Sequence, residues 1–147
     1  MYFEDFAPGY TITTPGRTIT EADIVAFAGL SGDFHPIHTD EIYARQTPFG
    51  KRVAHGALIL SISLGLATRL SQLGDTLLAL GALDKVRFSN PVFAGDTISV
   101  EKRVFETMEM DAIRGVVIFH THVHSHDQKV VLSYTDKLLV RRRAVPV

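Results

Sequence analysis

The sequence contains no cysteine. Disulfides, a thiol nucleophile and thiolate-bound metals are therefore excluded, and nothing indicates an oxidising compartment, so we expect a cytoplasmic protein. Uninterrupted apolar runs long enough to cross a bilayer are also missing, and the acidic segment 1–5 lacks the pattern of a signal peptide. We therefore expect no association with a membrane.

Neither positive nor negative charge is in excess. The 15 lysine and arginine residues nearly balance the 16 aspartate and glutamate residues. Because proteins that bind nucleic acid usually present a basic surface to the phosphates, this balance argues against a nucleic-acid partner. The one basic run, residues 141–143, is short and typical of a solvated tail.

The length and composition are those of one globular domain. A chain of 147 residues that is 46% hydrophobic and 21% charged forms one compact core and leaves no room for a second. We expect a single domain over residues 1–147.

Helix signals occupy the first third of the chain. Thr20 and Asp23 have the spacing of a capping box ahead of an apolar stripe, which predicts a helix over 21–29. Residues 32–38 contain glycine and proline without a helical period and predict a loop, and residues 39–41 can cap a second short helix. The loop is thus expected between two helices.

The rest of the chain predicts one long helix and then a sheet. Residues 54–73 are apolar on nearly all sides and end at Gly74, as in a helix that other elements enclose. Later segments rich in Val, Ile, Phe and Thr predict four strands, with a hairpin turn at 127–128: 77–88, 97–108, 113–126 and 129–142. We expect an α+β fold in which an antiparallel β-sheet wraps around a long central helix.

A sheet of this size leaves edge strands without partners. Pairing two copies along an edge covers the exposed backbone groups. We therefore expect a homodimer or a dimer of dimers.

The loop carries a carboxylate and an imidazole five positions apart, Asp33 and His38. Such a pair can bind one water molecule and exchange protons with it near neutral pH, which is the chemistry needed to add water to the double bond of an enoyl thioester. The alternative is structural, because Asp33 and His35 can also cap the loop, and Thr39 and Asp40 can cap the next helix. Spacing alone leaves both interpretations open.

A second candidate site is the start of the long helix, where Gly56 follows His55. The first amides of a helix have no partner within it, and glycine leaves them open to approach. The N–H of Gly56 can therefore hold a thioester carbonyl as that oxygen gains negative charge. The alternative is that Gly56 only permits close packing and that His55 is a satisfied core histidine.

Three segments resemble the MaoC-like hydratases, a family that includes the (R)-specific enoyl-CoA hydratases: residues 32–40 (GDFHPIHTD), 49–56 (FGKRVAHG) and 87–96 (RFSNPVFAGD). The resemblance extends over nearly the whole chain. It implies a hot-dog fold, which agrees with the architecture expected above. It also implies hydration of trans-2-enoyl thioesters of CoA or acyl carrier protein to (R)-3-hydroxyacyl thioesters, or the reverse dehydration.

Carried over residue by residue, the resemblance places the family's catalytic aspartate at Asp33, its catalytic histidine at His38 and its carbonyl-binding amide at Gly56. It implies no metal and no cofactor, since coenzyme A is part of the substrate.

One position departs from the pattern of the family. Some members carry a hydroxyl on the central helix where this sequence has Leu64. Ser61 and Ser63 lie nearby, but a helix turns about 100° per residue, so Ser63 points away from the direction of Leu64. We do not expect either serine to replace that hydroxyl.

Four histidines alternate along one predicted strand and share a face: His120, His122, His124 and His126. Imidazoles at this spacing can bind zinc or nickel, but no carboxylate or cysteine is interleaved with them. We expect a solvent-facing row and no functional metal site there.

Two other functions fit the same fold, namely acyl-CoA thioester hydrolysis and non-catalytic binding of an acyl thioester or a metal. Thioesterases of this fold generally place a carboxylate on the central helix, and residues 55–73 contain none. A binding module has no need of both Asp33 and His38.

Overall fold

The computed structural model describes residues 1–144; residues 145–147, the end of the expected domain, lie outside the described part. The helices are α1 (Glu21–Ser31), α2 (Pro36–Thr39), α3 (Glu41–Arg45) and α4 (Gly56–Thr68), with 3-10 turns η1 (Phe3–Asp5) and η2 (Gly74–Thr76). The strands are β1 (Thr11–Thr13), β2 (Arg17–Thr18), β3 (Leu77–Phe88), β4 (Thr97–Glu109), β5 (Arg114–Ser125) and β6 (Val130–Arg141).

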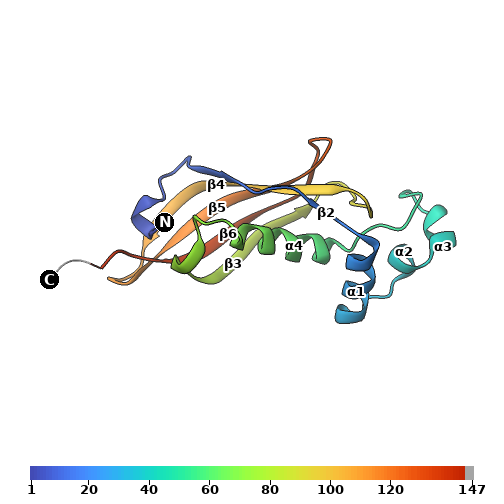
Figure 1. Ribbon diagram of the computed structural model, residues 1–147, viewed down its shortest axis with the longest axis horizontal. Coiled ribbons are helices and arrows are strands. Elements are labelled where there is room, and N and C mark those ends of the chain that lie inside the picture. Colours follow the sequence, from blue (N-terminus) through green and yellow to red (C-terminus); the bar gives the residue numbers. More distant parts are fainter. Residues whose placement is uncertain (145–147) are drawn as a thin grey trace.

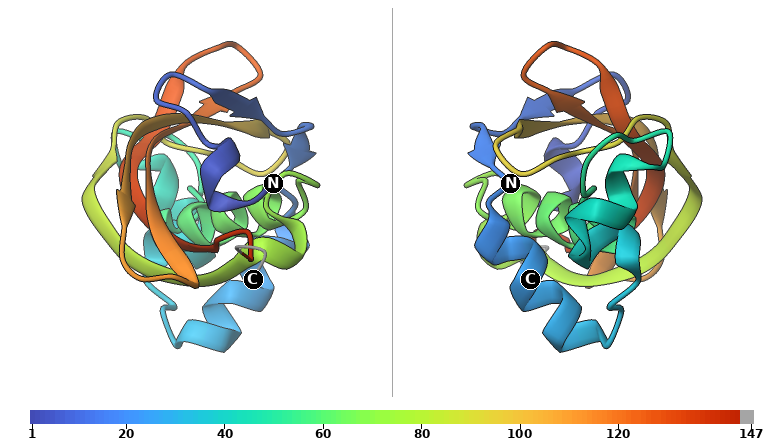
Figure 2. Two further views of the ribbon diagram at one scale, coloured as in Figure 1. Left: turned by 90° about the vertical axis from the view of Figure 1, so that its left-hand side faces the viewer. Right: turned by 90° about the vertical axis from the view of Figure 1, so that its right-hand side faces the viewer.

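One antiparallel sheet curves around α4, which confirms the predicted architecture (Figure 1, Figure 2). The strand order is β1-β4-β5-β6-β3, and β2 also pairs with β4. The four long strands coincide with the predicted ones to within a few residues. Strands β1 and β2 were not predicted, because three and two residues are too few to show an alternating pattern.

Strand β5 shows why the sheet has an inner and an outer face. Val117, Phe119 and Val123 are fully buried against the inside of the sheet, whereas His120 and His122 on the alternate positions are exposed. The alternation predicted from the sequence is therefore confirmed, and the inner face packs on α4.

Helix α4 is shorter than expected. It begins at Gly56 and does not continue to residue 73. The amides of Arg69, Leu70 and Leu73 bond to carbonyls three residues earlier, which tightens the chain into turns after the helix. These turns place Leu73, only 1% exposed, in the core.

Helices α1 to α3 gather at the end of the sheet where α4 begins, opposite the N-terminus (Figure 1). The capping box of α1 is confirmed by bonds of 3.2 Å and 2.8 Å between Thr20 and Asp23. The helix runs on to Ser31 and ends at Gly32, whose φ of 77° is left-handed. None of the helices within residues 1–144 is long and apolar enough to cross a bilayer.

The segment expected to be a loop contains a short helix, α2. Pro36 stands in its first turn, where the fixed φ of proline suits a helix, and His35 Nδ1 accepts from the amide of Ile37 at 3.2 Å. Four residues are too few to show a helical period, so the sequence pattern missed this turn. Asp40 caps α3 through the amide of Tyr43, at 3.0 Å, as expected.

Candidate active site

The start of α4 and the segment between α1 and α3 enclose a cavity of about 530 Å³. Most side chains that line it are apolar, and among the described residues of its lining His38 is the one titratable group. Its walls include Ile37, Phe49, Val53, Gly56, Phe88 and Val92.

His38 lies on α2 and is 8% exposed. Its Nδ1 atom is 2.6 Å from the carbonyl oxygen of Val53. A carbonyl oxygen only accepts, so Nδ1 carries the proton and Nε2 presents a lone pair. The amide of Val53 donates in turn to the carbonyl of Ile37 at 3.1 Å, which ties α2 to the segment ahead of α4.

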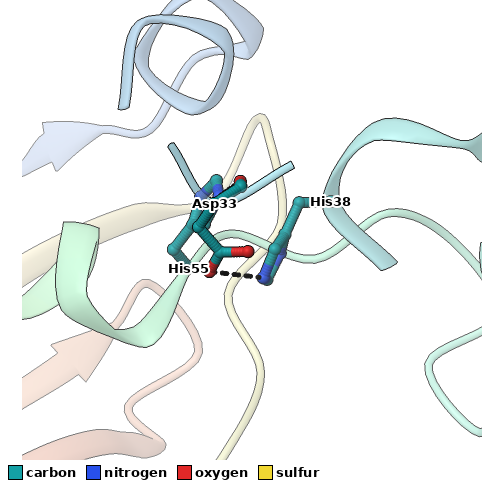
Figure 3. A group of neighbouring side chains, drawn as sticks. All are labelled: Asp33, His38 and His55. Carbon is teal, nitrogen blue, oxygen red and sulfur yellow. Dashed lines mark hydrogen bonds and ion pairs between the residues drawn. The ribbon is translucent and has the colours of Figure 1, made fainter. Parts of the chain in front are cut away.

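Asp33 follows Gly32 in the turn between α1 and α2, and about half of its side chain is exposed. Its Oδ1 atom accepts from the amide of His35 at 3.2 Å, so the capping role considered above is present. Its Oδ2 atom lies 3.8 Å from Nε2 of His38 (Figure 3). Both atoms are acceptors, and a water molecule can donate one hydrogen to each at this separation.

Burial lowers the pKa of His38 below its ordinary value. The Val53 carbonyl opposes this shift, His55 adds to it, and the charge of Asp33 opposes it. The imidazole of His38 is therefore neutral at neutral pH and able to accept a proton.

Gly56 is the first residue of α4 and lines the cavity. A Cβ atom at this position would lie 2.9 Å from the ring of Phe88 and would force that ring to shift, so glycine permits the close packing considered above. The start of α4 has no side-chain cap, which leaves the Gly56 N–H available at the cavity wall. The two interpretations of Gly56 are thus compatible.

His55 is a site residue that the sequence did not reveal. It is 2% exposed, and its ring stacks on that of His38. Its Nε2 atom is 2.9 Å from the backbone carbonyl oxygen of Asp33, while Nδ1 has no partner among the described residues. The alternative considered above, a satisfied core histidine, therefore holds for the burial of His55 and for Nε2 but not for Nδ1. The one feature of the sequence that could have indicated a role for His55 is its position directly before Gly56 in the segment 49–56.

Asp33, His38 and His55 form the one group of three side chains, within residues 1–144, that is close enough to hold a metal ion. Their ligand atoms lie within 4.8 Å of one another. However, Nε2 of His55 already faces a carbonyl oxygen, and Nδ1 of His38 does the same. The free pair, Asp33 Oδ2 and His38 Nε2, suits a water molecule as well as a cation.

The row of histidines on β5 holds three members rather than four, because the strand ends at Ser125 and His126 lies in the turn. His120 stacks on Phe105 with ring centroids 4.3 Å apart. The predicted solvent-facing row is confirmed for His120 and His122, and His124 is half-buried.

The serines of α4 lie outside the lining of the 530 Å³ cavity. Ser63 is buried and its hydroxyl is 3.0 Å from that of Tyr134, while exposed Ser61 bonds to the carbonyl of Ala57. Leu64 lines a separate cavity of about 310 Å³. As expected, neither serine supplies a hydroxyl to the Asp33–His38 pair.

Comparison with known sequences places the chain in a family. Residues 5–126 match the family described as MaoC like domain, so the chain belongs to the MaoC-like dehydratase family. The (R)-specific enoyl-CoA hydratase of Rhodospirillum rubrum is 42% identical over 99 residues, 67% of this chain and 65% of that protein. The 3-hydroxybutyryl-CoA dehydratase of Methylorubrum extorquens is 38% identical over 107 residues, 72% of this chain and 65% of that protein.

The matched segments thus span slightly less than two thirds of the length of both relatives. Both relatives are named as enzymes that add or remove water, which is hydro-lyase chemistry.

Solved structures show the same fold. The monoamine oxidase regulatory protein from Archaeoglobus fulgius superposes with a TM-score of 0.90 at 38% identity, covering 97% of this chain and 95% of that chain. A Mycobacterium tuberculosis protein described as having a double hotdog fold superposes with a TM-score of 0.84 at 18% identity, covering 100% of this chain and 46% of that chain. The fold is therefore the hot-dog fold.

Proposed function

We propose that the protein adds water to trans-2-enoyl thioesters to give (R)-3-hydroxyacyl thioesters, and that it catalyses the reverse dehydration. The observation that carries this proposal is the 3.8 Å approach of Asp33 Oδ2 to His38 Nε2 beside a largely apolar cavity that reaches a helix start. The (R) configuration is supported by the name of the Rhodospirillum rubrum relative. No metal and no cofactor takes part, since the substrate brings its own coenzyme A or carrier protein.

The first step activates water. The carboxylate of Asp33 and the neutral imidazole of His38 each accept one hydrogen of a water molecule, so the lone pair on oxygen is directed to the β-carbon of the substrate. As the C–O bond forms, Nε2 of His38 takes a proton from the water. The Asp33 carboxylate then stabilises the imidazolium that results.

The second step protonates carbon. The electrons of the C=C bond move toward the thioester carbonyl, whose oxygen accepts a hydrogen bond from the N–H of Gly56. The imidazolium of His38 then gives its Nε2 proton to the α-carbon and returns to the neutral form. His38 thus serves as base and acid in turn, while the apolar walls of the cavity bind the acyl chain.

The assembly that we infer is a homodimer, in the cytoplasm, joined through β3. Among the described strands, β3 pairs only with β6, so its other edge is open. Leu78 and Leu80 on this strand are 40% and 45% exposed. A second copy that pairs there covers both the backbone edge and the leucines.

The test is a spectrophotometric assay with crotonyl-CoA and a longer homologue, followed by chiral analysis of the product. We expect the enoyl-thioester absorbance to fall and the product to be the (R)-3-hydroxyacyl thioester. Release of free thiol would instead support thioester hydrolysis, although α4 carries no Asp or Glu for that reaction. Binding without turnover of any enoyl thioester would contradict the proposal and support a binding module.

A further inference from the structure

His55 contacts both members of the Asp33–His38 pair from the interior of the protein. Its Nε2 atom lies 2.9 Å from the backbone oxygen of Asp33 and must donate, because a carbonyl oxygen only accepts. Its ring stacks on that of His38, with centroids 3.8 Å apart and 27° between the planes (Figure 3). One buried side chain therefore links the two groups that are proposed to bind water.

The ring of His55 also makes an edge-on contact with the ring of Phe27 on α1. The two centroids are 5.0 Å apart, and the planes meet at 61°. His55 is also the N-cap residue of α4, yet its side chain makes no capping bond. The imidazole therefore contacts the neighbouring segments and does not cap its own helix.

The surroundings of the second ring nitrogen, Nδ1, indicate which tautomer His55 adopts. Nδ1 is buried and has no hydrogen-bond partner among the described residues. A proton there would create a buried N–H without an acceptor, which is costly. The proton accordingly stays on Nε2, where it maintains the bond to Asp33.

Asp33 needs such an anchor because about half of its side chain is exposed. Its amide bonds to Ser31 Oγ at 3.1 Å, and its Oδ1 accepts from His35, so both of these bonds stay within the same short segment. The bond from His55 reaches across 22 positions in the sequence and ties Asp33 to the start of α4. Asp33, the imidazole of His38 and the N–H of Gly56 are thereby all connected at the start of α4.

We propose that His55 is a positioning residue, which fixes the carboxylate of Asp33 relative to His38 by bonding to the backbone of the first and stacking on the ring of the second. This inference rests on the proposed function, because it assigns a role in the same site. A misplacement of about 1 Å at a catalytic pair can cost on the order of 10²-fold in rate.

A matched pair of variants isolates the hydrogen bond. His55→Gln and His55→Met have similar size and both lose the ring, but only glutamine can donate to the Asp33 carbonyl. We expect His55→Met to lower kcat by about 10-fold or more, with KM changed less than about 3-fold, and His55→Gln to keep most of kcat. His124→Met is the control. Its buried Nδ1 also has no partner within residues 1–144, but His124 lies on β5, on the face of the sheet that points away from α4, so kcat of this variant should not change.

A second readout does not depend on turnover. Titration of the His38 ring nitrogens by NMR should show a higher pKa in both His55 variants, because removing the stacked ring reduces the burial of His38. Equal kcat in His55→Gln and His55→Met, or a His38 titration that matches that of the unsubstituted protein, would overturn the inference. If the unsubstituted protein hydrates no enoyl thioester, the proposed function fails, and the NMR titration alone decides whether His55 acts on His38.

If His55→Met does not fold, His55→Phe replaces it in the kcat comparison, because phenylalanine keeps a ring but has no hydrogen-bond donor.

Discussion

The ammonium group of Lys102 contacts the carboxylate of Asp136 on the inner face of the sheet, where neither side chain is more than 1% exposed. The hydroxyl of Thr121 lies between them, accepting from Lys102 at 3.2 Å and donating to Asp136 at 2.6 Å. The ring centroid of Phe119 is 4.6 Å from the ammonium nitrogen. Strands β4, β5 and β6 are thus joined by one buried polar network.

Replacing Lys102 by methionine should strongly destabilise the protein. The change leaves the charge of Asp136 buried without a partner, which costs about 3–5 kcal/mol of unfolding free energy. The double variant Lys102→Met, Asp136→Leu should be less damaging than the single one. Urea denaturation gives the free energy of unfolding of both variants. Lys137→Met is the control, because it breaks an exposed ion pair and should lower that free energy by about 1 kcal/mol or less. A Lys102→Met variant as mild as this control would show that the buried pair is not needed.

The sheet was predictable because each long strand repeats its alternation many times. On β4, Lys102 falls between Val100 and Val104 on the inner face, so alternation alone places it in the core. The pattern does not name its partner, because Asp136 is two strands away and 34 positions later. Elements of two to four residues, such as α2, show no period at all and had to come from the structure.

The candidate site was predictable where residue types carry the chemistry. Asp33 and His38 stand out as a carboxylate and an imidazole in one short segment. The bond of His55 to the Asp33 carbonyl was not predictable, because every residue has a backbone oxygen and the contact leaves no mark on residue types. Gly56 was found as an open amide, but the need to accommodate Phe88 followed only from the packing.

A charge on the open edge of β3 should separate the inferred dimer. Leu80→Glu places a carboxylate where two copies would meet, so light scattering should show a lower mass for this variant than for the unsubstituted protein. Leu30→Glu is the control, since Leu30 is an exposed leucine on α1, away from β3. If light scattering showed that the unsubstituted protein is an active monomer in dilute solution, the inferred dimer would be contradicted.

Exhaustive chelation should leave turnover unchanged. In the proposed reaction His38 takes the proton from water directly, so no Lewis acid is required at Asp33, His38 and His55. The measurement is kcat after dialysis against a strong chelator, with the protein's metal content checked in parallel. Activity that disappears on chelation and returns with zinc would assign these three side chains to a metal centre instead.

The dependence of kcat/KM on pH should reflect the lowered pKa of His38. Burial disfavours the imidazolium, so the neutral base persists to lower pH, and the acid limb should lie below the ordinary histidine value of about 6.5. Activity is then fully present above that value and falls as the pH drops through the lowered pKa. An acid limb clearly above pH 6.5 would contradict the protonation state assigned to His38.

The most direct test of the proposed reaction is a double-mutant cycle on the pair that binds water. Asp33→Asn and His38→Gln both keep size and some hydrogen bonding. His38→Gln removes the group that takes and gives the proton, and Asp33→Asn removes the negative charge that orients the water molecule and stabilises the imidazolium. Each should lower kcat for crotonyl-CoA hydration by at least about 10²-fold with a much smaller change in KM, because the lost interaction belongs to the transition state.

The double variant should be little worse than either single one, since the two side chains act on the same water molecule. His35→Gln is the matched control, because His35 is exposed and, within residues 1–144, its ring accepts a hydrogen bond only from the amide of Ile37 two positions on, so its cost in kcat should be smaller. Near-full turnover in Asp33→Asn, or a loss in His35→Gln equal to that in His38→Gln with the fold intact, would contradict the assignment of the pair.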